Sequence, residues 1–105
     1  MTSQPNILDR IKKIVQDSDP SAKVYLYGSR ARGTMHPDSD WDLLILLNKD
    51  KITAEIEKNV TYPLYDLEFE IGEVISPLVY SEIEWNSKHR VTPFYSNVMR
   101  DGKLL

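Results

Sequence analysis

Two apolar runs flank the stretch GSRARGTMHPDSDWD, residues 28–42. The run before it, residues 23–27, is rich in β-branched and aromatic side chains, and the run after it, residues 41–47, is almost continuously apolar. Both patterns are typical of strands, and the second favours a central strand that is buried on both faces. The stretch between the two runs is therefore expected to be a connection at one end of a sheet.

Residues that can bind phosphate and metal stand at both ends of this connection. Gly28 allows close approach of the backbone, and Ser29 adds a hydroxyl beside the amides that begin a short helix, an arrangement that favours bound phosphate. Asp40 and Asp42 are two residues apart, so their carboxylates project from the same face of a strand. Such a pair can hold Mg²⁺. The sequence therefore predicts a site for a nucleoside triphosphate.

Two other phosphate- or metal-binding motifs share part of this pattern. Gly28 and Gly33 have the spacing of a Walker loop, but Thr34 and Met35 follow where Lys and Ser or Thr are needed. The alternating aspartates match the start of an EF-hand, but Leu43 stands at the required Gly and Lys49 at the required Glu. Neither motif is expected.

The composition limits the remaining possibilities. A chain of 105 residues is expected to form a single domain over residues 1–105. Its net charge of −3 provides no general field for nucleic acid, so a bound anion needs a local arrangement of charge. The absence of cysteine excludes disulfides, thiolate metal sites and Cys nucleophiles. No secretory signal pattern and no membrane-length apolar run is found, which predicts a cytoplasmic protein.

The spacing of apolar residues predicts the other elements of a small mixed α/β (α+β) sheet with helices packed on it. A long helix is expected over residues 52–71, with a kink or break near residues 61–62 because Pro63 interrupts it. Pro77 places its strand at a sheet edge. The further predictions are a helix at 6–17, a short helix from Ser29 to Gly33, a loop at 36–39 that includes His36, a strand at 74–80, a helix that opens at Ser81 and a helix at 92–100.

The joint pattern resembles the minimal nucleotidyltransferases (MNT-like) of the DNA polymerase beta-like nucleotidyltransferase superfamily. The signature of that group is Gly-Ser, a spacer of about ten residues and Asp-x-Asp, and here residues 28–29, 30–39 and 40–42 match it. The Arg-x-Arg-Gly extension of minimal members is present at residues 30–33. Residues 76–81 and 92–95 also look like this group, so the resemblance covers most of the chain.

The resemblance implies transfer of a nucleoside monophosphate, usually AMP from ATP, to a hydroxyl acceptor with release of pyrophosphate. Ser29, at the turn made by Gly28, would contact the β and γ phosphates. Arg30 or Arg32 would assist; the two lie two residues apart on a helix and diverge, so one of them is expected to reach the ligand. Asp40 and Asp42 would be catalytic and would hold one or two Mg²⁺, or Mn²⁺ in its place.

The chain departs from the family pattern mainly at the third carboxylate. That residue lies on the following strand, where the aligned position in this chain is Val74. Glu73 is adjacent, but a shift of one residue points a side chain to the opposite face unless a bulge intervenes. Either Glu73 serves as the catalytic carboxylate, or the chain is a catalytically impaired module that binds nucleotide or partner, or a scaffold that binds no nucleotide.

The resemblance and the short length of the chain both lead us to expect a partner molecule that carries the acceptor. A chain this short has no room for an acceptor-binding domain, and in the minimal family the partner is often a small HEPN-type protein, the two forming a toxin–antitoxin pair. Trp41 and Trp85 are expected in the core. The six tyrosines are too many for a small core to bury, so some are expected at an interface with a partner or with another copy of the chain.

Overall fold

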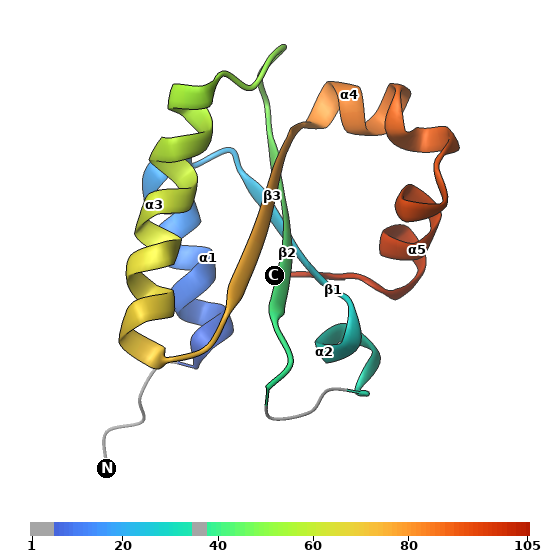
Figure 1. The fold of residues 1–105 in the computed structure, drawn as a ribbon. Coiled ribbons are helices and arrows are strands. Elements are labelled where there is room, and N and C mark those ends of the chain that lie inside the picture. Colours follow the sequence, from blue (N-terminus) through green and yellow to red (C-terminus); the bar gives the residue numbers. More distant parts are fainter. Residues whose placement is uncertain (1–5, 35–37) are drawn as a thin grey trace.

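The computed structural model describes residues 6–34 and 38–105. They form a four-stranded mixed sheet with helices on both faces, so the predicted fold class is confirmed (Figure 1). The elements in chain order are α1 (Ile7–Ser18), β1 (Lys23–Tyr27), α2 (Ser29–Arg32), β2 (Trp41–Leu47), α3 (Ala54–Ile71), β3 (Ile75–Ser81), α4 (Glu82–Ser87), the 3₁₀ helix η1 (His89–Val91), α5 (Pro93–Asp101) and β4 (Lys103–Leu104).

The strand order β3-β2-β1-β4 places β2 inside the sheet. β1 and β2 are antiparallel, whereas β2 and β3 are parallel and are joined by the crossover helix α3. In this register Asp42 is the partner of Tyr27 on one side and of Ser76 on the other. The end of β1 and the starts of β2 and β3 therefore meet at one end of the sheet.

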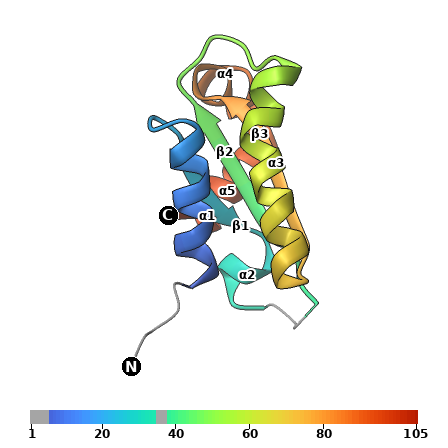
Figure 2. The same cartoon turned by 90° about the vertical axis from the view of Figure 1, so that its left-hand side faces the viewer.

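Alternation along β2 divides the core in two. Leu43 and Ile45 pack with the buried residues of α1 and α3, which lie side by side on one face of the sheet (Figure 2). Leu44 and Leu46 pack on the other face with Trp85 of α4 and Val98 of α5. All five residues from Leu43 to Leu47 are at most 3% exposed, as expected for a strand with no solvent face.

β3 is an edge strand, as its proline predicts. The Trp41 amide donates to the Val74 carbonyl at 2.9 Å, while the Ile75 amide points away from β2 and donates to Glu68 Oε2 at 2.7 Å. Because backbone groups alternate sides along a strand, Pro77 shares the outward direction of Ile75 and needs no donor there. The outer edge of β3 is thus partly blocked against further strand pairing.

The break predicted near residues 61–62 does not occur, because α3 runs continuously from Ala54 to Ile71 with Pro63 inside it. Proline has no amide to donate to the carbonyl four residues earlier, which is that of Asn59. In this fold the Ser18 hydroxyl, at the end of α1, donates to the Asn59 carbonyl at 3.1 Å. The neighbouring helix therefore supplies the hydrogen bond that Pro63 cannot make.

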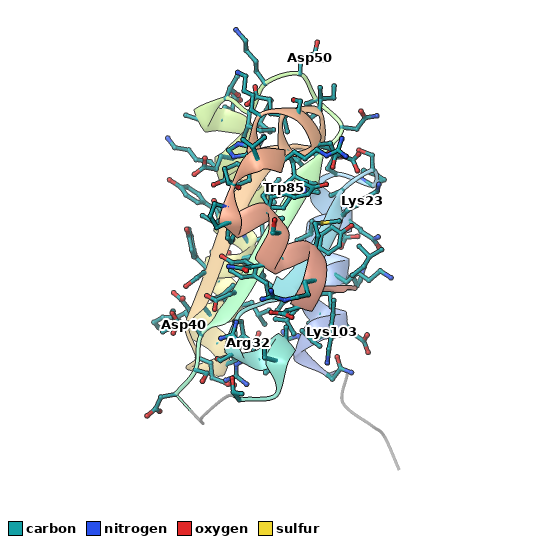
Figure 3. The ribbon with its side chains drawn as sticks, turned by 90° about the vertical axis from the view of Figure 1, so that its right-hand side faces the viewer. Lys23, Arg32, Asp40, Asp50, Trp85 and Lys103 are labelled. Atoms are coloured by element: carbon teal, nitrogen blue, oxygen red, sulfur yellow. The ribbon has the colours of Figure 1, made fainter. Side chains whose placement is uncertain are left out.

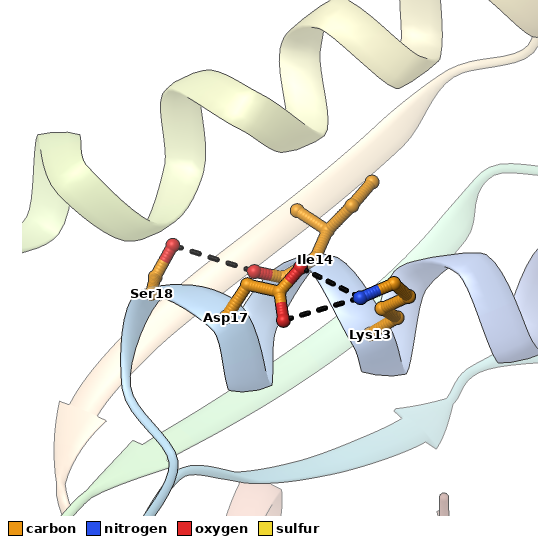
Figure 4. Close-up of polar contacts among 4 residues, drawn as sticks. All are labelled: Lys13, Ile14, Asp17 and Ser18. Atoms are coloured by element: carbon orange, nitrogen blue, oxygen red, sulfur yellow. Dashed lines mark hydrogen bonds and ion pairs between the residues drawn. The ribbon is translucent and has the colours of Figure 1, made fainter.

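A double-mutant cycle tests this compensation. Ser18→Ala is expected to cost about 1 kcal/mol of unfolding free energy, since it leaves the Asn59 carbonyl without that donor. Pro63→Ala is expected to add about 1–3 kcal/mol by restoring the helical amide. In the Pro63→Ala background, Ser18→Ala should cost less than half as much, measured by urea unfolding. Equal costs in both backgrounds would mean that Ser18 acts only within α1, where its hydroxyl also lies 3.3 Å from the Ile14 carbonyl (Figure 4).

The other predicted helices and strands are confirmed to within two residues. Gly33 ends α2 in the left-handed region, and the Ser81 hydroxyl caps α4 by accepting from the Glu84 amide. β4 and η1 are absent from the predictions; β4 has only two residues and pairs with Tyr25 and Leu26. His36 lies outside the described residues. Among those that are described, no helix is long and apolar enough to cross a membrane.

Candidate functional site

Gly28 is required at the turn between β1 and α2. Its φ of 76° and ψ of −157° belong to a region that only glycine adopts readily. A Cβ atom at this position would collide with the Asp42 carboxylate. The backbone of the turn therefore lies directly against the carboxylate of the next strand, and the predicted Gly-Ser turn and Asp pair are brought together.

Asp40 and Asp42 lie at the start of β2 and interact with each other. Asp40 is exposed and accepts from the Ser76 hydroxyl at 3.3 Å, whereas Asp42 is half-buried. Burial and then the negative charge of Asp40 raise the pKa of Asp42, while the positive charge of Arg32 lowers it. A bound cation would offset the charge repulsion between the two carboxylates.

Tyr27 is a neighbour of Asp42 that sequence reasoning missed. It is the antiparallel partner of Asp42, and its ring meets that of Phe94 edge-on at 5.2 Å between centroids. Burial, with the charge of Asp42 next, raises the pKa of Tyr27 to about 12, so its hydroxyl stays protonated. Only the strand register reveals this residue, because nothing in the local pattern separates Tyr27 from a core tyrosine.

The two arginines of α2 diverge, as predicted. Arg32 is exposed, and its charge acts on Asp42 and on Asp101 of α5. Figure 3 shows Arg32 and Asp40 at the same end of the molecule. The Arg30 side chain is 10% exposed and is engaged by other groups, which are the Ser39 carbonyl, the Glu73 carboxylate and the Trp41 ring. Arg32 is thus the arginine that remains open to a ligand.

Glu73 lies away from the Asp pair. Its Oε1 accepts from Arg30 Nη2 at 3.2 Å and from Trp41 Nε1 at 3.3 Å. Trp41, which is expected in the core, is half-buried and packs against the core. Within residues 6–34 and 38–105, no three carboxylate or imidazole side chains are grouped closely enough to hold a metal. The β3 residue beside Asp42 is Ser76. Glu73 is therefore not brought to Asp40 and Asp42 as a third ligand.

The two carboxylates fit a divalent cation that takes its remaining ligands from water and from substrate phosphates. Two carboxylates on one face, one of them exposed, suit Mg²⁺, which keeps several waters and binds proteins through one or two carboxylates and substrate phosphates. The turn at Gly28 lies against the Asp42 carboxylate, and the charges of Asp40 and Arg32 both act on that carboxylate. The arrangement can hold a metal-bound phosphate chain against the first turn of α2.

Comparison with known proteins supports the fold and identifies the family. Several solved structures share the fold, and three of them are described here. One, a toxin–antitoxin complex with AMP-PNP, is 22% identical with a TM-score of 0.67, and the match covers 94% of this chain and 72% of the other. Another, an MntA–HpeT toxin–antitoxin complex with a point substitution, is 23% identical with a TM-score of 0.62, covering 97% of this chain and 72% of the other.

The third structure is an MntA–HpeT complex with two substitutions; it is 20% identical with a TM-score of 0.63, and the match covers 90% of this chain and 68% of the other. Among curated proteins none matches significantly. The profile of the nucleotidyltransferase domain family matches residues 8–100, which include the Gly-Ser turn and the Asp pair. The chain therefore belongs to the nucleotidyltransferase domain family and is a nucleotidyltransferase.

Proposed function

We propose that the chain transfers AMP from ATP to a hydroxyl on a partner molecule, in a reaction that depends on a divalent metal. The observation that carries the proposal is the packing of the Gly28 backbone against the Asp42 carboxylate, beside Asp40. This packing joins a phosphate-binding turn to a pair of metal-binding carboxylates. It supports a common role for them in holding the triphosphate.

Each residue of the site has a role that follows from its position. Ser29, in the first turn of α2, would donate to the β and γ phosphates, and the backbone amides of Ser29 and Arg30 would add to this, because those of Ala31 and Arg32 already donate to the Gly28 carbonyl. Arg32 would offset the phosphate charge from the open side. Asp40 and Asp42 would hold Mg²⁺ or Mn²⁺, which when bound neutralises charge on the phosphates.

For the transfer itself, the protein mainly has to position the reacting groups. An acceptor oxygen forms a bond to the α-phosphorus, the bond from that phosphorus to the bridging oxygen breaks, and pyrophosphate leaves. The acceptor proton passes to solvent, since Glu73 is engaged by Arg30 and Trp41. Binding the triphosphate in one orientation, with its charge neutralised, is the contribution of this chain.

The acceptor is proposed to lie on a protein partner of the HEPN type, with which the chain would form a toxin–antitoxin pair. The three solved structures compared above are described as toxin–antitoxin complexes, and one of them contains AMP-PNP. Exposed aromatic residues on α3, Tyr62, Tyr65 and Phe69, offer surface for a partner or for a second copy of the chain.

Labelled ATP distinguishes the proposed transfer from other reactions. ATP labelled at the α-phosphate should label the co-expressed partner in the presence of Mg²⁺, whereas ATP labelled at the γ-phosphate should not. EDTA should abolish the signal, and Asp50→Asn, a charge change at the other end of the molecule, should leave it unchanged (Figure 3). Label from the γ-phosphate alone would indicate phosphoryl transfer and contradict the proposal.

A catalytically impaired binding module is the second candidate, and Ser76 is the observation that favours it. This hydroxyl occupies the position beside Asp42 on β3, where a carboxylate would complete a set of three. Such a module would bind ATP with Mg²⁺ and release no pyrophosphate. Binding without any label transfer to the partner would therefore favour this candidate.

Introducing the carboxylate tests the same position. Ser76→Asp is expected to raise the affinity for Mn²⁺ about tenfold, because metal affinity follows the number of charged ligands. The measurement is calorimetric titration with MnCl₂. Ser87→Asp, which adds the same charge at an exposed position of α4, should leave the Mn²⁺ affinity unchanged. An unchanged affinity in Ser76→Asp would mean that position 76 does not face the metal.

A further inference from the structure

Arg30 has an unusual environment for a residue of a phosphate-binding turn. Its guanidinium carbon lies 3.9 Å from the centroid of the Trp41 ring, a cation–π distance. Its Nε donates to the Ser39 carbonyl at 3.0 Å, and its Nη2 donates to Glu73 Oε1 at 3.2 Å. The side chain is 10% exposed, so it offers little surface to a ligand.

All of these contacts are with the residues that surround the Asp pair. Ser39 precedes Asp40, and Trp41 lies between Asp40 and Asp42. Glu73 accepts from both Arg30 and the Trp41 indole, so one carboxylate oxygen joins α2 to the start of β2. The backbone bond from the Trp41 amide to the Val74 carbonyl lies beside this contact.

This cluster and the metal-binding carboxylates lie on opposite faces of the sheet. Trp41 packs against the core under α1 and α3, whereas Asp42, on the opposite face by strand alternation, lies with Tyr27 and Ser76. Arg30 and Glu73 therefore hold the strand from behind while the carboxylates project forward. A contact of this kind can fix where the carboxylates point without touching what they bind.

We propose that Arg30, Trp41 and Glu73 form a clamp that positions Asp40 and Asp42 for the metal, and that Arg30 does not bind phosphate. Arg30 and Glu73 are thus positioning residues that act through the backbone of residues 39–41. The inference rests on the proposed function, because the consequence of the clamp is metal and nucleotide binding. It also replaces a direct catalytic role for Glu73 with an indirect one.

Binding of Mn²⁺ in the absence of nucleotide separates the two roles for Arg30. If Arg30 positions the carboxylates, Arg30→Ala lowers Mn²⁺ affinity about tenfold, as loss of an outer-shell partner does. If Arg30 only binds phosphate, Arg30→Ala leaves Mn²⁺ affinity unchanged or raises it, because a positive charge is removed. Arg32→Ala is the matched control, expected to weaken ATP binding without lowering Mn²⁺ affinity.

Glu73 completes the test as a double-mutant cycle. Glu73→Ala should also lower Mn²⁺ affinity about tenfold, and the double variant should lose no more than either single variant, because each change opens the same clamp. Glu73→Gln keeps a carbonyl acceptor for Arg30 and Trp41 and should recover most of the affinity. The clamp would be contradicted if the fold-losses of Mn²⁺ affinity in the two single variants multiplied in the double variant. It would also be contradicted if Glu73→Gln bound Mn²⁺ as weakly as Glu73→Ala.

Hydrogen exchange at the Trp41 amide decides the clamp independently of any ligand. At a temperature where circular dichroism shows every variant folded, this amide should exchange at least tenfold faster in Arg30→Ala and Glu73→Ala, and at the wild-type rate in Arg32→Ala. Unchanged exchange would overturn the clamp even if the wild type binds Mn²⁺. A wild type that binds no Mn²⁺, with exchange accelerated as expected, would contradict the metal site and leave the clamp standing.

Discussion

Replacing Asp40 and Asp42 together by asparagine is expected to abolish metal-dependent binding of ATP while the chain stays folded. Both carboxylates lie at the start of β2, and that of Asp42 stands against the Gly28 turn. The loss should exceed about 100-fold, since loss of an outer-shell partner alone costs about 10–100-fold. Calorimetric titration of ATP in the presence of Mg²⁺ measures it.

The stability of the same variant provides the control for folding. The pKa of Asp42 is raised in the folded chain by burial and by Asp40, so the charged form of this carboxylate destabilises the fold at neutral pH. This cost is absent at a pH below the ordinary pKa of aspartate, grows as pH rises from that pKa to the raised one, is complete above it and is removed by Asn. The variant should therefore melt at the wild-type temperature or above it. Unchanged ATP affinity with Mg²⁺ in the double variant would refute the site assignment.

Replacing Gly28 by alanine is expected to damage both the fold and the site. The backbone at this position is strained for any residue with a Cβ, and that Cβ would collide with the Asp42 carboxylate. Strain of this kind costs about 2–3 kcal/mol, which lowers the melting temperature of a chain of this size by roughly 10–20 °C. ATP binding with Mg²⁺ should be lost even well below the melting temperature, because Asp42 must move.

Gly33→Ala is the matched control for this prediction. Gly33 also has a positive φ, 73°, but no atom lies within 4 Å of the Cβ that alanine would add. Its cost should be only that of the left-handed conformation, about 1 kcal/mol, with ATP affinity retained. Equal losses of ATP affinity in the two variants would show that backbone strain at α2, and not contact with Asp42, explains the result.

Much of the fold follows from local patterns in the sequence. Residues 41–47 are apolar at every position after Asp42, and only a strand with helices on both faces buries all of them. Pro77 identifies β3 as an edge, because its missing amide has no place between two strands. Such features depend on residues that are adjacent or regularly spaced, so they can be predicted without the tertiary structure.

The errors come from contacts between distant parts of the chain. In the unbroken α3, the Asn59 carbonyl that Pro63 leaves without a helical donor accepts from the Ser18 hydroxyl, which comes from a different helix. Glu73 lies in the bend before β3, where strand alternation does not place it, and its partners, Arg30 and Trp41, come from α2 and β2. In both cases the deciding hydrogen bond joins residues whose separation in sequence gives no periodic signal.

The central claim is that Asp40 and Asp42 form a working metal site for a nucleoside triphosphate. The most direct measurement is calorimetric titration of ATP into the wild-type chain, first with Mg²⁺ and then with EDTA. The account predicts saturable binding with Mg²⁺ and none in EDTA. Equal binding in both conditions, or no binding with Mg²⁺ at millimolar ATP, would contradict it.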